Sequence, residues 1–496
     1  MARDNGGIIG PANNPTSDSA SGVWDLPAQY QAISGGNWPP IPSIAENSLR
    51  FDDGSSDYLN RTQSSGNRKT FTISCWLKRS NLGGGKIITG INDGVAPYAR
   101  IFFDTNDVLK IEDDNGSTVT NIVTNRKFRD VSAWYHLVIA YDTTQATASD
   151  RVKMYVNGVQ ETSFSSSTYP SQNFDTEYNK ASVAINIGKF SSSYFDGYMS
   201  EFYMIDGQAL APSDFGEFDE DSGIWKPIAY EGTYGTNGFF LEFKDSSALG
   251  DDTSVNGNDF TVNNLTSIDQ TTDTPTNNFA TMNPLGKSGA GTTGSPTFSN
   301  GNLTVAMSSD TFAYSTLGVA QGKWYFEFTQ SENTADNDGY PIVGFNTTGI
   351  GAAGDTIGFR TPSGSDYRGQ IGTSSISNAF LSARVVNDVF GFYLDLDNST
   401  LIIHKNGSTY MNTGYTSGLD WSAGLTTTNT QTGFYFPYIQ SNSANAFTDS
   451  FNFGNAPYTI SSGNEDANGH GNFEYSPTLG AVNYFALCTK NLAEYG

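Results

Sequence analysis

The feature that most constrains the fold of this chain is a period-two alternation of apolar and polar residues that recurs along most of its length. In residues 136–142 (HLVIAYD) and 151–158 (RVKMYVNG) a large apolar residue occupies every second position, and Asn157 and Gly158 close the second stretch. Period two is the repeat of a half-buried β-strand, and an Asn-Gly pair favours a tight turn between antiparallel strands. The sequence therefore predicts an all-β protein with little helix.

The alternation occurs in two long runs, which divide the chain into five parts. We predict two antiparallel β-sandwiches in tandem, at residues 47–245 and 297–460. Residues 246–296 are rich in Asp, Thr, Asn, Gly and Ser and are interpreted as a linker with one edge strand at residues 260–262. Residues 1–46 are rich in Gly, Pro, Asn and Ser with scattered aromatic residues, and are interpreted as a short irregular N-terminal anchor. Residues 461–496 are a C-terminal extension.

Composition excludes several classes of function. The 496 residues include 26 basic and 51 acidic side chains, a net charge of −25 that repels a phosphate backbone, so nucleic acid is not an expected partner. The two cysteines, Cys75 and Cys488, are too few for a disulfide framework and have no neighbours that indicate metal or nucleophilic chemistry. The first 22 residues lack the features of a signal peptide, and no long apolar run occurs, so we expect synthesis in a cytoplasm and no membrane insertion.

One acidic motif is a candidate for catalysis. Glu217, Asp219 and Asp221 in GEFDEDSG have the alternate spacing that places carboxylates on one face of a strand, as in some sandwich glycosidases. Glu220 interrupts the motif, and charge runs usually form solvated loops. We therefore expect no enzymatic activity, with a polysaccharide depolymerase as the alternative.

Two Gly-flanked stretches of the second predicted sandwich are candidates for ligand binding. They supply Asp338 and Tyr340 in the first stretch, and Asp366, Tyr367 and Arg368 in the second. Sugar rings stack on aromatic side chains and their hydroxyl groups suit Asp and Arg, so these loops are candidate glycan contacts. The alternative is that they are ordinary exposed turns.

Acidic residues of the first predicted sandwich are candidates for a Ca²⁺ site. Asp52, Asp53 and Asp57 in FDDGSSD, and Asp104 with Asp107 in FFDTND, carry the oxygen ligands that calcium prefers. No EF-hand spacing is present, and hydrated turns are the alternative. Apart from Ca²⁺, no cofactor is expected.

Both halves resemble known families. The stretches SLRFDDGSSDYL, FTISCWLKR, WYHLVIAYD, VKMYVNGV, INIGKF and FDGYMSEFYMIDGQAL, between residues 48 and 215, resemble laminin-G-like lectin modules of concanavalin type. The stretches GKWYFEF, IVGF, NDVFGFYLDLDNSTLIIHKNG, FPYI and FNFG, between residues 300 and 455, resemble SPRY domains. The resemblance implies two concanavalin-like sandwiches that bind ligands, the candidate loops of the second lying where SPRY-like domains bind theirs; it implies no reaction.

The two ends of the chain resemble segments of structural proteins from tailed phages, especially cyanophages. The matching stretches are GIIGPANNPTSDSASGVWDLPAQYQAISGGNWP and GNFEYSPTLGAVNYFALCTKNL. The resemblance implies a tail fibre or head appendage on the virion exterior, a homo-oligomer that attaches to a host surface glycan or protein. Residues 1–46 would bind other virion proteins through Trp24, Tyr30 and Trp38, since aromatic residues often dominate interfaces. A cytoplasmic SPRY-type interaction protein is a further alternative.

Overall fold

The computed structural model describes residues 44–220, 222–287, 295–308, 311–330, 342–347, 356–360, 368–372, 374–381, 386–422, 433–441 and 447–496. The chain divides into two units, Met1–Glu46 and Asn47–Gly496, and the elements below belong to the second. Across these ranges the elements are strands, apart from the C-terminal helix α2 (Thr489–Tyr495) and the 3-10 turns η2 (Asn92–Gly94), η3 (Ala148–Asp150), η4 (Pro212–Asp214) and η5 (Ser267–Asp269). The all-β prediction is confirmed. No helix in these ranges has the length and apolar character needed to cross a membrane.

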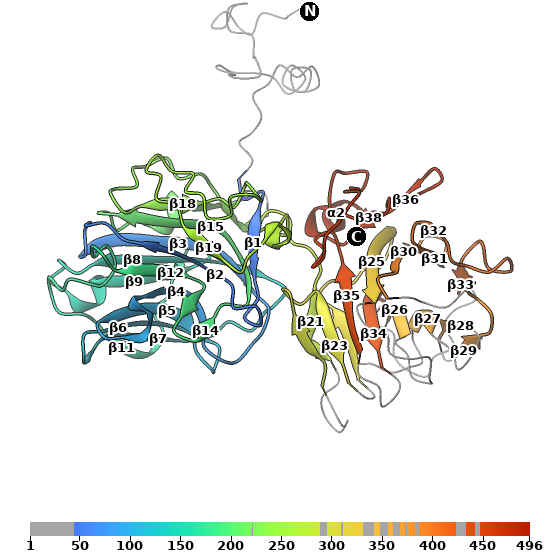
Figure 1. Ribbon diagram of the computed structural model, residues 1–496, viewed down its shortest axis with the longest axis horizontal. Coiled ribbons are helices and arrows are strands. Elements are labelled where there is room, and N and C mark those ends of the chain that lie inside the picture. Colours follow the sequence, from blue (N-terminus) through green and yellow to red (C-terminus); the bar gives the residue numbers. More distant parts are fainter. Residues whose placement is uncertain are drawn as a thin grey trace, which may run out of the picture. The chain divides into compact units, whose positions relative to one another are not determined.

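The first sandwich, coloured blue to green in Figure 1, consists of two eight-stranded sheets. One sheet has the order β10 (Val159–Gln160), β9 (Val152–Val156), β8 (Trp134–Asp142), β3 (Thr70–Arg79), β15 (Gly197–Asp206), β1 (Ser48–Phe51) and β20 (Gln270–Thr271), with β18 (Phe239–Leu241) beside β15. The other has the order β11 (Phe164–Thr168), β7 (Thr118–Lys127), β6 (Val108–Asp114), β5 (Tyr98–Phe103), β4 (Lys86–Ile91), β12 (Ala184–Ile187), β2 (Tyr58–Thr62) and β19 (Thr261–Asn263). Two hairpins, β13 (Lys189–Phe190) with β14 (Ser193–Tyr194) and β16 (Gly216–Phe218) with β17 (Trp225–Pro227), lie outside these sheets.

The core of the first sandwich lies between its two sheets. Ile73 and Ile139 from one sheet and Ile101 and Ile111 from the other belong to one cluster of buried side chains, each at most 2% exposed. Burial alternates residue by residue along β9, as the sequence predicts.

The central strands β3 and β15 depart from that alternation, because they are buried on both faces. Cys75 faces the core, where burial raises the pKa of its thiol to about 12. On the opposite face Trp76 stacks on His136, with ring centroids 4.7 Å apart, and the Nε1–H of Trp225 donates to His136 Nδ1 over 2.9 Å. Trp225 belongs to β17, so the β16–β17 hairpin covers an outer face that simple alternation leaves exposed.

The segment predicted as a linker contributes strands to both sandwiches. β19 and β20 extend the two sheets of the first sandwich, and β21 (Met282–Lys287) begins the second. The domain boundaries derived from the sequence stay a prediction.

A buried lysine fixes the path of the chain between the two sandwiches. Lys78 lies on the outer face of β3 and is 1% exposed. Its ammonium group donates to Asp273 Oδ2 (2.7 Å), Asn278 Oδ1 (2.7 Å) and the carbonyl oxygen of Phe279 (3.0 Å). Trp134 Nε1 donates to the second oxygen of Asp273 over 3.2 Å. Because each ammonium proton has an acceptor, the burial of the charge is compensated locally.

The second sandwich, coloured yellow to red in Figure 1, also consists of two main sheets. One has the order β21, β24 (Phe312–Ser315), β34 (Phe436–Gln440), β26 (Ile342–Asn346), β27 (Thr356–Arg360), β28 (Arg368–Ile371) and β29 (Ser374–Ile376). The other has the order β22 (Thr297–Ser299), β23 (Thr304–Met307), β35 (Phe447–Asn452), β25 (Lys323–Gln330), β30 (Val389–Asp395), β31 (Thr400–Lys405) and β32 (Ser408–Thr409), with β33 (Leu419–Asp420) beside β31 and β38 (Phe485–Ala486) beside β25. A small hairpin joins β36 (Thr478–Leu479) to β37 (Val482–Asn483).

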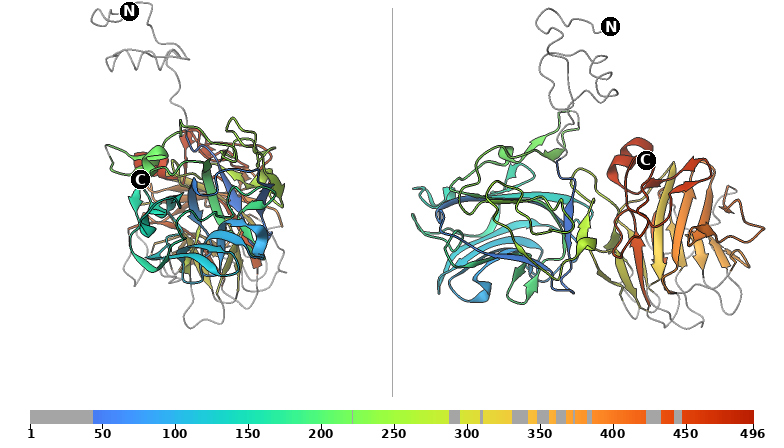
Figure 2. Two further views of the ribbon diagram at one scale, coloured as in Figure 1. Left: turned by 90° about the vertical axis from the view of Figure 1, so that its left-hand side faces the viewer. Right: turned by 45° about the horizontal axis from the view of Figure 1, so that its top comes forward.

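The C-terminal segment covers part of the outer face of the β25 sheet. β38 pairs with β25 in the parallel sense, and Figures 1 and 2 show this red segment beside the yellow strand. Phe473 and Tyr484 pack there against Tyr325 and Tyr393, a cluster separate from the core between the sheets. The same face carries the hollow described in the next section.

Asp113 is an acidic side chain inside the first sandwich. It lies on β6 and is 2% exposed, and the hydroxyl of Tyr141 donates to its Oδ2 over 3.2 Å. Burial raises the pKa of Asp113 to about 6, and the nearby Glu177 and Glu112 add to the rise while the hydrogen bond from Tyr141 opposes it. At neutral pH the folded protein therefore carries a buried charge that destabilises it.

We predict that Asp113→Asn stabilises the protein at high pH but not at low pH. Because the folded-state pKa is raised, the stabilising proton is present below about pH 4 and is lost as pH rises through 6. The substitution should raise the free energy of unfolding by up to ~3 kcal/mol at pH 8 and change it little at pH 4. Urea unfolding of both proteins at the two pH values measures the difference, and equal effects at both would contradict the prediction.

Candidate functional site

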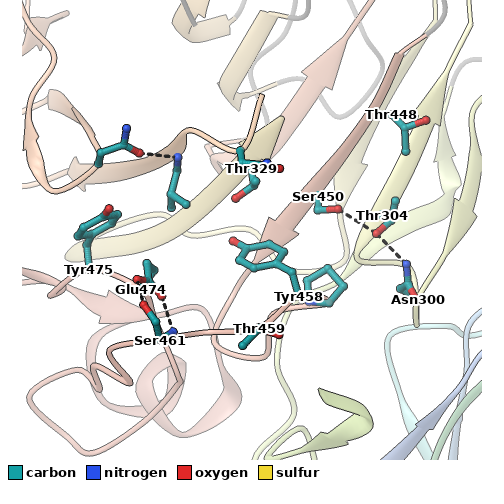
Figure 3. Close-up of a pocket in the computed structure, with 14 residues that line it drawn as sticks. Asn300, Thr304, Thr329, Thr448, Ser450, Tyr458, Thr459, Ser461, Glu474 and Tyr475 are labelled. Atoms are coloured by element: carbon teal, nitrogen blue, oxygen red, sulfur yellow. Dashed lines mark hydrogen bonds between the residues drawn. The ribbon is translucent and has the colours of Figure 1, made fainter. Parts of the chain in front are cut away.

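A hollow of about 570 Å³ opens on the outer face of the second sandwich, over the sheet that contains β23, β35 and β25 (Figure 3). Residues 457–461 and 474–475 form its opposite side. Its lining is rich in hydroxyl groups, which come from Thr304, Thr329, Thr448, Ser450, Thr459 and Ser461. Amide side chains of Asn300, Asn387 and Asn406 add further donors and acceptors.

The hydroxyl groups on the floor of the hollow follow from strand alternation. In β23 and β35 the apolar residues face the core, so Thr304 and Ser450 face outward. Ser450 is in register with Thr304 on one side and with Thr329 of β25 on the other. The Thr304 and Ser450 hydroxyls are 3.0 Å apart, and Asn300 Nδ2 donates to Thr304 Oγ1 over 3.1 Å. Three neighbouring strands therefore present one polar strip.

Two tyrosines, Tyr458 and Tyr475, flank the hollow in Figure 3. The ring of Tyr475 lies over Gly407, where an added Cβ would come within 2.7 Å of the ring. Gly407 has a φ of +73°, so the Asn406–Gly407 turn both bends the chain and leaves room for the aromatic ring. The hydroxyl of Tyr458 is buried close to that of Thr329, and burial raises the pKa of Tyr458 while the Thr329 hydroxyl opposes the rise.

A buried carboxylate, Glu327, holds the wall that carries Tyr475. Its Oε1 accepts hydrogen bonds from the Tyr325 hydroxyl (3.0 Å) and from the Tyr475 backbone N–H (2.7 Å). Its Oε2 accepts from Asn452 Nδ2 (2.9 Å) and from the Glu474 backbone N–H (3.0 Å). Burial raises the pKa of Glu327 to about 7, and these donors oppose the rise. Glu327 therefore positions the pocket wall from beneath.

The charge in the described lining of the hollow is negative. Glu474 is the carboxylate in its lining, and it accepts hydrogen bonds from the backbone N–H and the hydroxyl of Ser461. Within the described ranges, no lysine, arginine or histidine lines the hollow. The site therefore suits ligands rich in hydroxyl groups better than anions.

Most of the ligand-binding and anchoring residues predicted from the sequence lie outside the described residues. These are Asp338, Tyr340, Asp366, Tyr367, Trp24, Tyr30 and Trp38. Arg368 is described; it begins β28, is half-buried and pairs in register with Arg360. The ligand role of these loops and the anchoring role of the three aromatic residues stay predictions.

The predicted calcium ligands come together only in part. Asp52 and Asp53 meet Asp196, which precedes β15, with ligand oxygens of all three within 4.8 Å of one another. Asp57 instead accepts a hydrogen bond from the Asp52 backbone N–H (2.9 Å), and Asp104 caps the turn before β6 by accepting from Asn106.

A lysine already balances the charge of the Asp52, Asp53 and Asp196 cluster. The ammonium of Lys86 contacts Asp53 and lies 4.0 Å from Asp196. Burial raises the pKa of Asp196 well above its usual value, and a hydrogen bond between Asp196 and Asp53 helps to lower the pKa of Asp53 against the effect of burial. A calcium ion would have to displace Lys86, so these residues fit a lysine-neutralised cluster better than a calcium ion, and calcium binding stays a prediction.

The acidic motif considered for catalysis lies at the β16–β17 hairpin. Glu217 and Asp219 both form ion pairs with Lys226, at 3.3 and 3.1 Å, and Asp219 also accepts from Ser222. Asp221 is outside the described residues. The two described carboxylates thus share one cation on an exposed turn.

Comparison with known proteins identifies the first sandwich. Residues 53–214 match the Laminin_G_3 family model, described as the concanavalin A-like lectin/glucanases superfamily. The concanavalin-like fold predicted from the sequence is therefore confirmed for this part of the chain. No curated protein matches the chain.

Several solved structures are similar to parts of this chain at low identity. The SPRY domain of human HERC1 is 16% identical, with 34% of this chain and 96% of that chain covered and a TM-score of 0.24. A candidate carbohydrate binding protein from Bacteroides ovatus is 18% identical, with 45% and 59% covered and a TM-score of 0.33. Domain 4 of AbnA, an extracellular arabinanase from Geobacillus stearothermophilus, in complex with arabinotriose, is 16% identical, with 40% and 83% covered and a TM-score of 0.27.

We predict that Glu327→Gln loosens the pocket wall without unfolding the sandwich. Glutamine keeps one acceptor oxygen but places an amide N–H₂ against the other donors, so two of the four hydrogen bonds are lost. Exchange of the Glu474 and Tyr475 amide hydrogens should become at least ~10-fold faster, a local cost of about 1.4 kcal/mol. Hydrogen-exchange mass spectrometry measures this, with Glu494→Gln on the exposed face of α2 as the control. Unchanged exchange in Glu327→Gln would show that the carboxylate does not hold the wall.

Proposed function

We propose that the protein is a non-enzymatic adhesion protein that binds a surface glycan through the hollow on its second sandwich. The observation that carries the proposal is the composition of that hollow: two tyrosine rings stand over a floor of hydroxyl and amide groups. Sugars present apolar ring faces and many hydroxyl groups, so they match aromatic walls and a polar floor. The lectin-type family match of residues 53–214 supports the same class of ligand for the chain.

The alternative of a depolymerase is less well supported. Glycosidases use two carboxyl groups that flank the scissile bond, separated by about 5–9.5 Å. Glu474 lines the hollow, whereas Glu327 lies beneath the wall with both oxygens engaged. Among the described lining residues there is one carboxylate, which supports recognition rather than hydrolysis.

The second part of the proposal concerns where the protein acts. The N-terminal and C-terminal resemblance to structural proteins of tailed phages supports a place on the virion exterior, as a tail fibre or head appendage. In this proposal residues 1–46 bind other virion proteins, a homo-oligomer forms on the particle, and the sandwiches attach to the host surface.

We predict that Tyr475→Ala and Tyr458→Ala each weaken glycan binding at least ~10-fold, about 1.4 kcal/mol, because each removes one aromatic wall. Binding of the purified protein to host-cell polysaccharide, followed by isothermal titration calorimetry, provides the measurement. Tyr314→Ala is the control, since Tyr314 is also half-buried but lies on β24 of the other sheet. If both pocket variants bind as the unmodified protein does, the hollow is not the site.

We predict that a variant without residues 1–46 folds normally but is missing from purified phage particles. Residues 47–496 form a unit of their own, so their circular dichroism and melting temperature should not change. Immunoblotting of purified particles measures incorporation. Incorporation at the normal level would reject the anchor.

A further inference from the structure

We propose that the glycan is a neutral, linear oligosaccharide that occupies two adjoining hollows, the second of which is completed by the first sandwich. This inference rests on the proposed glycan-binding function and adds the charge class of the ligand, its shape and the second subsite.

A second hollow of about 300 Å³ adjoins the first. Tyr458 and Thr459 line both, so the two hollows meet at these residues. On one side the second hollow is lined by Ser246 and Ser267, which belong to the chain segment that follows β18, and on the other by residues such as Asn472 of the C-terminal segment. Its surface is more polar than that of the first hollow. A chain of sugar units that fills the first hollow is therefore directed past Tyr458 into the second.

A buried arginine clamps the two sides of the second hollow. Arg50 of β1 is 1% exposed, and its guanidinium donates to the carbonyl oxygens of Ile268 (2.9 Å) and Ala456 (3.3 Å). Asn455 Oδ1 accepts from the backbone N–H and the hydroxyl of Thr272, at 2.7 and 3.1 Å. Ile268 and Ala456 both line the hollow, so these contacts set its width. Such a preformed site spares the ligand part of the ordering cost of binding.

The charges around both hollows exclude an acidic glycan. Within the described ranges, neither lining contains a lysine, arginine or histidine. The negative Glu474 lines the first hollow, whereas Asp388, which accepts from the lining residue Asn406 over 2.8 Å, is paired with Lys405 at 3.2 Å. A sugar carboxylate or sulfate would lose its hydration without gaining a cation, and the net charge of −25 adds a long-range repulsion. A neutral sugar has no charge to desolvate and is not repelled by the net charge of the protein.

The charge class and chain length are tested on a glycan microarray. The array carries neutral gluco-, manno-, galacto- and arabino-oligosaccharides from monosaccharides to hexasaccharides, beside oligogalacturonates of the same lengths. We expect binding to at least one neutral series, with trisaccharides and longer chains at least ~10-fold tighter than the monosaccharide, and no binding to the oligogalacturonates. Preference for the acidic series, or equal affinity at every length, would overturn the inference but leave the proposed function intact. Absence of binding to every glycan would overturn both.

The second subsite is tested by filling it. Ser267→Trp and Ser246→Trp each place an indole in the second hollow at an exposed position, which limits the effect on folding. Each should remove the ~10-fold advantage of the longer neutral chains while leaving binding of the shortest bound sugar unchanged. Ser171→Trp, at an exposed position of the first sandwich far from both linings in the sequence, is the control. If both pocket variants melt as the unmodified protein does and keep the full length dependence, the second hollow is not part of the site.

Discussion

The interaction on which the arrangement of the described residues most depends is the buried ammonium of Lys78. It is enclosed by Asp273, Asn278 and the Phe279 carbonyl, and Asp273 is held in turn by Trp134. Removing one partner from such a buried pair typically costs 3–5 kcal/mol, because the other charge stays buried without compensation. The contacts fix residues 273–279 on the outer face of the first sandwich, from which the chain continues directly into β21. They thereby set where the chain leaves the first sandwich and enters the second.

The sequence predicts the β-class of the fold well because alternation reports which residues face a core. It predicts less well what covers an outer face. Lys78 and Trp76 fall on the outward positions of FTISCWLKR, yet both are buried, since residues distant in the sequence cover them. A period-two pattern contains no information on which distant residues cover the outer face of a strand. For the same reason, a composition typical of a linker did not reveal β20 and β21, whereas the edge strand predicted at residues 260–262 corresponds to β19.

In the candidate site, too, local sequence patterns predict some features, whereas others depend on contacts between segments far apart in the sequence. Thr448 and Ser450 occupy alternate positions between Phe447 and Phe451 in FTDSFN, and the Asn406–Gly407 turn is recognisable in the sequence. The strand order β23-β35-β25, which brings Thr304, Ser450 and Thr329 together, joins segments that no local pattern relates. The same holds for the acidic cluster. Asp52 and Asp53 are adjacent in the sequence, whereas Asp196 and Lys86 lie close to them only in the folded protein.

Two glutamates near the hollow support the proposed recognition function. A general acid or base must exchange a proton with the substrate, so it needs a lone pair or proton directed at the reacting group. Glu327 has a pKa raised to about 7 by burial, a value suited to proton transfer, but its two oxygens accept four hydrogen bonds from the protein. Glu474 lines the hollow and bonds Ser461, without a second accessible carboxylate beside it among the lining residues. The buried carboxylate thus holds one wall of the hollow in place, and its raised pKa follows from its burial, which is consistent with the proposed binding function.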